Sequence, residues 1–345
     1  MAFEFLPATP HDRAALVAFL LDAFQLPAHA PFVSSDLLRW KYDEPRPDWS
    51  GPRSYVMKDG ARIVAHACLC PVTFETAAGA ATSNHLIDWA GARDAPGSGM
   101  LLLRKLAAFS ETLLAEGGSP QTQQMLPKLG YTRHGDLLSY VRVIRPWLQF
   151  RTDPARRGWK APLRLARSAI WSLASTPAVP AAWAVTPVTQ FDVLPAIDAG
   201  ASFVAPRRSP ELLNYMLRCP RAHFSAGLLS RGGVPSGWFV LSRVGGQGRI
   251  ADISVNSQLP EDWQAAYALA TREAAAAPEV CEVAAQASFP LAAEALERNG
   301  FHLRNREPIF LFDPRKKLTG AAPLGIQMID WDAAYLHNPE YPYLS

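Results

Sequence analysis

The chain has 345 residues, of which 49% are hydrophobic and 19% are charged, and its formal net charge is +3. This length exceeds what one hydrophobic core usually organises, so we expect two domains. The first residues show no basic segment followed by an apolar run, which argues against a secretion signal. No apolar stretch approaches the ~20 residues that span a bilayer. We therefore expect a cytoplasmic protein, and its abundant Arg, Ala and Pro suggest a GC-rich bacterial genome.

The first elements form a helix-rich segment followed by strands. Thr9 to Asp12 have the pattern of a helix N-terminus, and the helix that follows is expected to end at Pro27. A shorter helix is predicted over residues 37–42. Strands are predicted over residues 54–57 and 62–73 around a turn at Gly60, and after a second turn at Gly79 over residues 84–90.

The paired cysteines Cys68 and Cys70 lie in the second of these strands, two residues apart and so on one face. No second pair or neighbouring histidine completes a metal site, and the sequence offers no other metal cluster. We expect all four cysteines, including Cys219 and Cys281, to be buried, reduced and structural.

A glycine-rich turn, residues 94–100, follows the strand over residues 84–90 and opens a helix. The first N–H groups of a helix have no partner within it, and the helix dipole favours an anion there. The turn therefore predicts a phosphate or pyrophosphate site. Its backbone ligands would be Gly97, Ser98, Gly99 and Met100, with Arg93 or Arg104 near the phosphates and Trp89 as a further contact.

After this turn the sequence predicts a helix that ends at Glu116, where Gly117 and Gly118 follow. A second helix is predicted over residues 122–128, ending at Gly130. A strand over residues 137–144 then closes the first unit at Pro146.

This order of elements resembles the GNAT superfamily of acyl-CoA N-acyltransferases over residues 1–146. Three pieces carry the resemblance: the hairpin at residues 58–65, the glycines Gly97 and Gly99, which match the Q/R-x-x-G-x-G/A pyrophosphate signature, and residues 125–131, similar to the family's L-Y-x-K-x-G-F segment. The resemblance implies an α/β fold, a mixed and mostly antiparallel sheet flanked by helices. It also implies acetyl-CoA or another acyl-CoA as co-substrate and transfer of the acyl group to a small-molecule or peptide amine.

Three positions depart from the family pattern. Asp94 occupies the Q/R position, Pro96 lacks an N–H group, and Leu126 stands where the family often has the tyrosine that protonates the leaving thiolate. Arg93 could supply the positive charge that Asp94 removes. These departures keep open a second interpretation, a non-catalytic CoA-binding or scaffold protein.

Two residues of the strand over residues 84–90 are candidates for general acid–base catalysis. His85 has an imidazole whose usual pKa suits a base, and Asp88 offers a carboxylate. Strand alternation puts His85 on one face with Ile87 and points Asp88 to the other. The alternative for both is a buried polar group that hydrogen-bonds to neighbouring backbone.

The second half of the chain reads as a degenerate copy of the first. Residues 209–215 are similar to 34–40, and residues 299–310 are similar to 129–140. A hairpin over residues 236–241 and a strand over 249–253 lie between, but no glycine loop follows Val255. We therefore expect two GNAT-like domains, of which only the first binds CoA. Tandem units with one competent half also resemble FemABX-type aminoacyl transferases, although the broad basic face expected of those enzymes is missing.

The expected domain boundaries are 1–146 for the first domain, 147–182 for a basic helical linker, 183–314 for the degenerate domain and 315–345 for an aromatic tail. Eight basic residues and one acid, Asp153, lie between Arg142 and Arg167. Residues 162–173 read as a basic amphipathic helix, followed by a Pro/Ala linker over 175–184. We favour a solvated linker helix over membrane-surface contact through residues 151–173. Nucleic-acid binding is disfavoured, and nothing indicates an oligomeric state.

Overall fold

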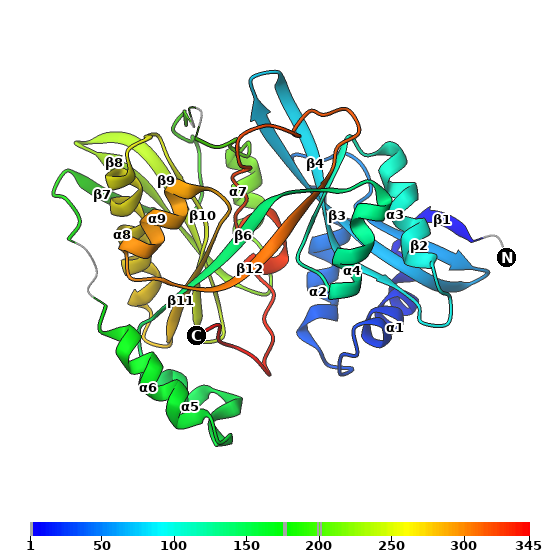
Figure 1. Cartoon of the computed structure of the whole chain (residues 1–345), viewed down its shortest axis with the longest axis horizontal. Helices are drawn as coiled ribbons and strands as arrows, with labels where there is room; N and C mark the ends of the chain where they lie inside the picture. The colour runs from blue at the N-terminus through cyan, green and yellow to red at the C-terminus, as the bar shows by residue number, and fades with distance from the viewer. Residues whose placement is uncertain (1–2, 175–177, 199, 201) are drawn as a thin grey trace. The chain divides into compact units, whose positions relative to one another are not determined.

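The computed structural model describes residues 3–174, 178–198, 200 and 202–345, and the chain divides into two compact units (Figure 1). Unit 1 comprises Met1–His134 and Pro308–Ala321, and unit 2 comprises Gly135–Glu307 and Ala322–Ser345. This division differs from the sequential boundaries predicted above. The reason is that a strand from late in the sequence completes the sheet of unit 1, whereas a strand from the first half belongs to the sheet of unit 2. In unit 1, β12 (His302–Phe312) pairs with β5 (Thr112–Glu116), whereas in unit 2, β6 (Thr132–Val143) pairs with β11 (Glu282–Ala287).

The sheet of unit 1 has the strand order β1 (Glu4–Pro7), β2 (Ser54–Asp59), β3 (Arg62–Thr76), β4 (Gly79–Gly91), β5 and the end of β12. Its neighbours run antiparallel except β4 and β5, which run parallel. The sheet is thus mixed and mostly antiparallel, and both predicted hairpins are confirmed.

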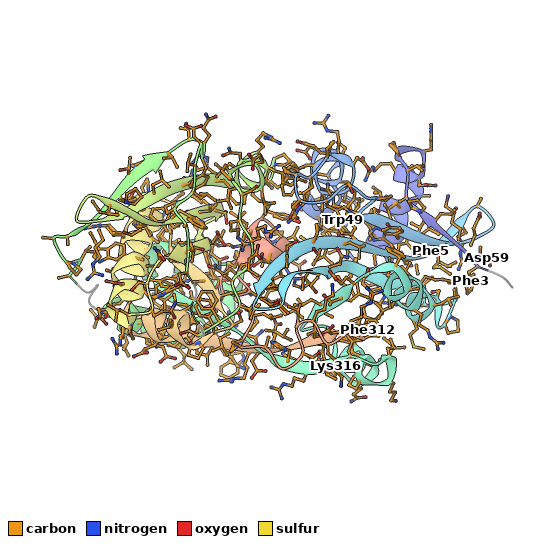
Figure 2. All side chains as sticks on the ribbon, turned by 90° about the horizontal axis from the view of Figure 1, so that it is seen from above. Phe3, Phe5, Trp49, Asp59, Phe312 and Lys316 are labelled. Carbon is orange, nitrogen blue, oxygen red and sulfur yellow. The ribbon has the colours of Figure 1, made fainter. Side chains whose placement is uncertain are left out.

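The helical elements of unit 1 are α1 (Arg13–Ala23), α2 (Ser35–Leu38), a π-helical turn η3 (Arg39–Asp43), α3 (Ser98–Phe109), α4 (Pro120–Met125) and the 3-10 turn η4 (Leu126–Leu129). Short 3-10 turns η1 (Pro10–Asp12) and η2 (Pro31–Val33) precede α1 and α2. Leu102, Leu103 and Leu106 of α3 pack on Leu69 and Leu86 of the sheet. Phe3, Phe5, Trp49 and Phe312 lie at the margin of this core (Figure 2).

The predicted helix from the glycine turn to Glu116 is wrong in its second half. α3 ends at Phe109, and residues 112–116 form the strand β5. Leu113, Leu114 and Ala115 are good helix formers, so their propensity continues the helical pattern. The parallel pairing of Thr112, Leu113 and Leu114 with β4 overrides that propensity, because it buries these side chains in the sheet.

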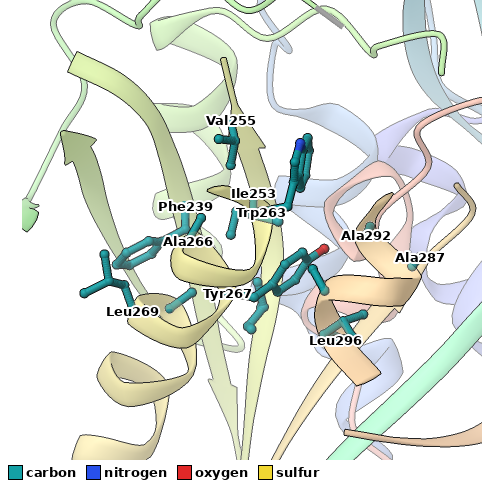
Figure 3. Packing of buried hydrophobic residues seen from close by; sticks show 14 of the residues in the cluster. Phe239, Ile253, Val255, Trp263, Ala266, Tyr267, Leu269, Ala287, Ala292 and Leu296 are labelled. Carbon is teal, nitrogen blue, oxygen red and sulfur yellow. The ribbon is translucent and has the colours of Figure 1, made fainter. Parts of the chain in front are cut away.

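Unit 2 has the strand order β6, β11, β10 (Gln247–Val255), β9 (Val234–Val244), β8 (His223–Arg231) and β7 (Trp183–Val188). Its helices are α5 (Pro146–Thr152), α6 (Ala161–Ser172), α7 (Pro210–Leu217), α8 (Pro260–Ala276) and α9 (Pro290–Arg298), with 3-10 turns η5 (Pro154–Arg157), η6 (Met328–Asp330) and η7 (Asp332–Ala334). Trp263 and Tyr267 of α8 pack against Leu296 of α9 and the sheet (Figure 3).

The predicted hairpin and strand of the second half are β9 and β10, and the predicted basic helix is α6. Of the predicted Pro/Ala linker, residues 175–177 lie outside the described residues. All four cysteines are buried and free of disulfides, as expected. Within the part of the chain that the structure describes, no helix is both long and apolar enough to cross a membrane.

Candidate functional site

A β-bulge interrupts β4 at Asp88. His66 of β3 pairs with Ala90 and Cys68 pairs with Ile87, so Asp88 and Trp89 together oppose Ala67. Asp88 has a φ of 54°, in the left-handed region that non-glycine residues seldom adopt. In the described residues, the β4–β5 ladder runs only from Ser83–Thr112 to His85–Leu114, although β4 continues to Gly91. The bulge therefore coincides with the point where two parallel strands part.

The N-terminus of α3 stands at the end of the β4 stretch beyond His85, which stays paired to β3 on one edge but, among the described residues, is unpaired on the edge that faced β5. Gly97 caps the helix with a φ of 85°, and its carbonyl accepts the first helical bond from Leu101 N at 2.9 Å. A Cβ at Gly97 would meet no atom within 4 Å, so the approach to the loop is open. The N–H groups of Gly99 and Met100 precede Leu101 N, the first intrahelical donor, and N–H groups in the first turn of a helix can bind an anion.

Close packing fixes this helix end against β4. A Cβ added to Gly91 would lie 2.9 Å from the backbone nitrogen of Gly99, so only glycine fits there. Trp89 Nε1 donates a hydrogen bond to Gly99 O at 3.0 Å, and the buried Ser98 Oγ donates to Val64 O at 2.8 Å. Of the predicted ligand residues, Trp89, Ser98 and Gly99 thus position the loop through side chains or close contact.

Asp94, at the Q/R position of the glycine signature, forms an ion pair with Arg62. Arg62 on β3 binds both carboxylate oxygens of Asp94, at 2.7 and 2.8 Å, and this contact lowers the pKa of Asp94. The negative charge of Asp94 at the loop is therefore offset by the positive charge of Arg62 on β3. Arg93 and Arg104, the predicted phosphate ligands, are both exposed to solvent.

Asp88 anchors the π-helical turn η3 to the bulge. Its Oδ2 accepts a hydrogen bond from Tyr42 Oη at 2.6 Å and lies 2.6 Å from Lys41 Nζ. The Lys41 and Asp88 side chains are each only 2% exposed. Lys41 Nζ also sits 5.2 Å from the centre of the Phe32 ring. A buried ion pair of this kind holds a fixed geometry, because separating either charge from its partner is costly.

The predicted orientation of Asp88 is wrong. Cross-strand partners share a face, so Cys70 and His85 point to one side, and Arg46, just beyond η3, contacts Cys70 Sγ at 3.1 Å. Asp88 reaches Tyr42 of η3 and therefore lies on that same side. The extra residue at the bulge resets the alternation of the strand, which places both acid–base candidates on one face of the sheet.

A second buried histidine completes the polar cluster at the bulge. His66 Nε2 lies 2.9 Å from Ser54 Oγ, and its Nδ1 lies 3.1 Å from the carbonyl oxygen of Asp88. Burial lowers the pKa of His66 to about 4, against the opposing pull of Asp88. The neutral ring therefore links β2 and β3 to the strained backbone of β4.

His85 sits where the β4–β5 ladder ends. Its Nε2 is 4.0 Å from Glu116 Oε2, and the two side chains are 2% and 0% exposed. Burial lowers the pKa of His85 to about 3, so the imidazole is neutral at physiological pH. The structure thus brings the sequence-predicted His85 together with Glu116, the last residue of β5, which the sequence prediction had placed at a helix end.

Lys41, Tyr42, His66 and Glu116 were missed by sequence reasoning. For Lys41 a signal was present: it lies three and four residues after Leu38 and Leu37, which are both buried, so helical spacing puts it on the buried face. A buried lysine needs a carboxylate partner. No such periodicity marks His66 or Glu116, whose contacts come from pairing between strands distant in sequence.

Leu126, at the family's tyrosine position, is fully buried in the core beneath α3. It opens η4, which ends at Gly130 with a φ of 88°, as the sequence predicts for the helix stop. The nearby Tyr131 is also buried, and burial raises the pKa of its hydroxyl. Neither residue presents an acid to the unpaired stretch of β4.

The equivalent region of unit 2 is filled by its own chain. β10 has a bulge after Ile250, and its parallel ladder with β11 ends at Ile250–Ala285. Beyond that point the Gln327 side chain accepts from Ile253 N and donates to Ile253 O, both at 2.9 Å. Ser288, which follows β11, bonds to the backbone of Leu324 and Ile326. Residues 324–327 thus lie where β10 and β11 part.

No protein-family model matches the chain, and no curated protein matches it in sequence. Solved structures do match. A GCN5-related N-acetyltransferase from Anabaena variabilis superposes with a TM-score of 0.56 at 12% identity, covering 90% of this chain and 72% of that one. A GCN5-related N-acetyltransferase from Kribbella flavida gives 0.52 at 12% identity, with coverage of 90% and 70%.

A tandem GNAT protein from the clavulanic acid biosynthesis pathway also matches, with a TM-score of 0.52 at 14% identity, and covers 90% of this chain and 98% of that one. At these identities the likeness concerns the fold. It agrees with the mixed, mostly antiparallel sheets and flanking helices described above. The chain therefore has the fold of the GNAT superfamily, present as two units in tandem.

Proposed function

We propose that unit 1 binds an acyl-CoA along the unpaired stretch of β4 and transfers its acyl group to an amine. The observation that carries the proposal is that β4 leaves β5 at His85 and runs on to the open N-terminus of α3. Such an edge presents backbone N–H and C=O groups that an extended amide-containing arm can pair with. From Leu86 to Gly91 the strand spans about 16 Å, on the scale of an extended pantetheine arm.

The residues at the loop fit a pyrophosphate. Gly97 leaves the approach open, and the N–H groups of Gly99 and Met100 belong to the first turn of α3, at the positive end of its dipole. Arg62 neutralises Asp94, the one acid of the loop. The exposed Arg93 and Arg104 add positive charge without being tied to the core.

The chemistry requires a free amine and a stabilised carbonyl oxygen. The amine nitrogen attacks the thioester carbon, the carbon–sulfur bond breaks, the amine loses a proton and the CoA thiolate gains one. A backbone N–H of β4 beyond His85 would hold the developing oxyanion. With a pKa of about 3, His85 is a weak base, so we assign it and Glu116 to positioning at the ladder end. Asp88 fixes η3 over the strand through Tyr42 and Lys41.

A second candidate function is CoA binding without catalysis. Leu126 is a buried aliphatic residue and has no proton to give to the leaving thiolate, and both acid–base candidates are buried. The same site supports either function, and thiol release separates them. A panel of amines is incubated with acetyl-CoA and longer acyl-CoAs, and free CoA thiol is followed with a chromogenic disulfide. Release that requires both protein and amine supports the enzyme, whereas binding without release supports the second candidate.

Binding itself is tested by calorimetric titration with acetyl-CoA. The decisive variants are Gly97→Asp and Gly97→Asn. Both residues tolerate the left-handed backbone of this position better than other side chains and both fit its open space, but only the aspartate brings a charge. We expect Gly97→Asp to weaken binding at least tenfold and Gly97→Asn to weaken it far less. Equal affinities in the two variants would place the phosphates elsewhere.

A further inference from the structure

Helix α6 of unit 2 exposes large aliphatic side chains that a helix packed on its own domain would usually bury. Its fully buried residues are small, Ala161 and Ser168. Three large aliphatic side chains point to solvent, since Leu163 and Ile170 are each 67% exposed and Leu173 at its C-terminus is 81% exposed. Leu165 and Trp171 are half-buried. A helix that stabilises its own fold shows the reverse pattern, with large apolar residues inward.

These residues form one continuous face. At 100° per residue, Leu163, Ile170 and Leu173 fall within an arc of roughly 120°. The other positions in that arc are exposed as well, and all are apolar: Pro162, Ala166 and Ala169. The α6 face, defined by these six residues, is thus free of charged groups.

Two exposed tryptophans lie in the same helical hairpin as the α6 face. Trp159, just before the helix, is 81% exposed, and Trp147 of α5 is 60% exposed. With Leu163, Ile170 and Leu173 they make up five of the fourteen large hydrophobic residues that are exposed in the described part of the chain, within 27 consecutive positions. Figure 1 shows α5 and α6 as a helical hairpin that projects from the sheet of their unit.

Positive charge borders the α6 face. The exposed Lys160 and Arg164 and the half-buried Arg167 fall along one side of the apolar arc, and Arg151 and Arg156 of the hairpin are exposed. The single acid among these residues, Asp153, lies 3.8 Å from Arg164 and offsets only one of the charges. An apolar stripe with tryptophan and a basic flank is the pattern of a helix that lies in the interface of an anionic bilayer.

We infer that the α5–α6 hairpin docks this protein on an anionic membrane surface, with the α6 face in the interface and the basic flank against the headgroups. A second copy of the chain is a poorer occupant, because symmetric pairing of the α6 face would bring two basic flanks together. The exposed large aliphatic residues also distinguish α6 from the solvated linker helix favoured on sequence grounds. The inference concerns unit 2 and does not depend on acyl-CoA binding by unit 1.

The test is co-sedimentation of the full-length protein with vesicles of phosphatidylcholine alone or with 30% phosphatidylglycerol. We expect binding to the anionic vesicles and at least a tenfold weaker partition to the neutral ones. Binding should fall as salt rises, since the charges act at the surface. The paired variant Arg156→Glu and Lys160→Glu should lower the partition constant strongly, because each basic residue contributes a factor of about five.

The apolar contribution is tested with Leu163→Asp and Ile170→Asp together. We expect at least a tenfold loss of vesicle binding with an unchanged melting temperature, because both side chains are exposed in the free protein. Val193→Asp and Val234→Asp are the matched controls, since these residues of unit 2 are 74% and 63% exposed but lie outside the hairpin, and they should bind like the wild type.

Four results would overturn the inference. These are no sedimentation with anionic vesicles, equal binding to neutral vesicles, unchanged binding in the Leu163/Ile170 variant, or an equal loss in the controls. A dimer in light scattering that the Leu163/Ile170 variant converts to a monomer would instead assign the α6 face to a second copy of the chain.

Discussion

Lys41 Nζ lies 2.6 Å from Asp88 Oδ2, and with each side chain 2% exposed this ion pair joins the helical layer of unit 1 to the bulge in β4. The same oxygen accepts a hydrogen bond from the Tyr42 hydroxyl, and the backbone carbonyl oxygen of Asp88 lies 3.1 Å from His66 Nδ1. The left-handed backbone at Asp88 is thus held from two sides. This arrangement accounts for a strained residue at the point where β4 leaves β5.

Replacing Lys41 by methionine should destabilise unit 1 by about 3–5 kcal/mol, because it leaves the Asp88 carboxylate buried without its cation. The measurement is the free energy of unfolding in urea. Lys317→Met is the matched control in the same unit, since Lys317 pairs with Glu111 at side chains that are 38% and 28% exposed. That substitution should cost about 1 kcal/mol or less. Equal costs for the two variants would show that the buried pair has no special role.

Stability should fall as the pH drops from about 6.5 towards 4. Burial lowers the pKa values of His66 and His85 from the ordinary 6.5 to about 4 and about 3. Below pH 6.5 and above these lowered values, each histidine therefore binds a proton in the unfolded chain but not in the folded chain. Their contribution is complete above pH 6.5 and is lost as the pH falls through this window. Each histidine accounts for about 1.4 kcal/mol per pH unit.

The check is urea unfolding at several pH values for wild type and His66→Gln. The difference in slope between pH 6 and 4.5 should be about 1.4 kcal/mol per pH unit, one histidine's share. His29→Gln, at an exposed position, should leave the slope unchanged. A slope in His66→Gln that equals the wild-type slope would mean that His66 is protonated in the folded protein.

Local signals in the sequence were enough to find the glycine loop. Gly97 and Gly99 stand where a strand gives way to a helix, and the structure places Gly97 at the cap with a φ of 85°. The bulge at Asp88 could not be found in this way, because one extra residue in a strand changes no composition or period. It depends on the register between β3 and β4, which sequence alone does not specify.

Two other differences between the predicted and the observed elements, at β5 and at the strands β6 and β12, also come from pairing between distant strands. Residues 112–116 have helical propensity but pair with β4, and β6 and β12 pair in the unit opposite to their place in the sequence. In each case a non-local hydrogen-bonded ladder decides the outcome. The ion pair of Asp94 also could not be predicted from the sequence, because its partner Arg62 lies 32 residues away, on β3.

Removing Arg62 should weaken acyl-CoA binding by unmasking Asp94 beside the proposed phosphate site. We expect a several-fold rise in Kd for Arg62→Ala, growing at low salt where screening is weak. Adding Asp94→Asn to that variant should restore the affinity, because the repulsive charge is gone. Titration of the three proteins with acetyl-CoA provides the test. Failure of the second substitution to restore binding would show that Arg62 contacts the ligand directly.

Gln327→Ala should destabilise unit 2 by about 2–4 kcal/mol, because it leaves the N–H and C=O groups of Ile253 buried without partners. Thermal unfolding of the full chain measures the effect. Gln190→Ala, an exposed glutamine bonded only to Asp192 among the contacts described, should change the melting temperature little. Wild-type stability of Gln327→Ala would mean that residues 324–327 do not hold β10.

We propose an acyl-CoA site in unit 1 alone, because the helix that follows β10 in unit 2, α8, is capped by Leu259 and not by a glycine, and residues 324–327 lie where β10 and β11 part. The most direct measurement is the stoichiometry of acetyl-CoA binding to the full chain by calorimetry. We expect one equivalent per chain, abolished or greatly weakened by Gly97→Asp. Two equivalents, no binding, or one equivalent that Gly97→Asp leaves unchanged would contradict it.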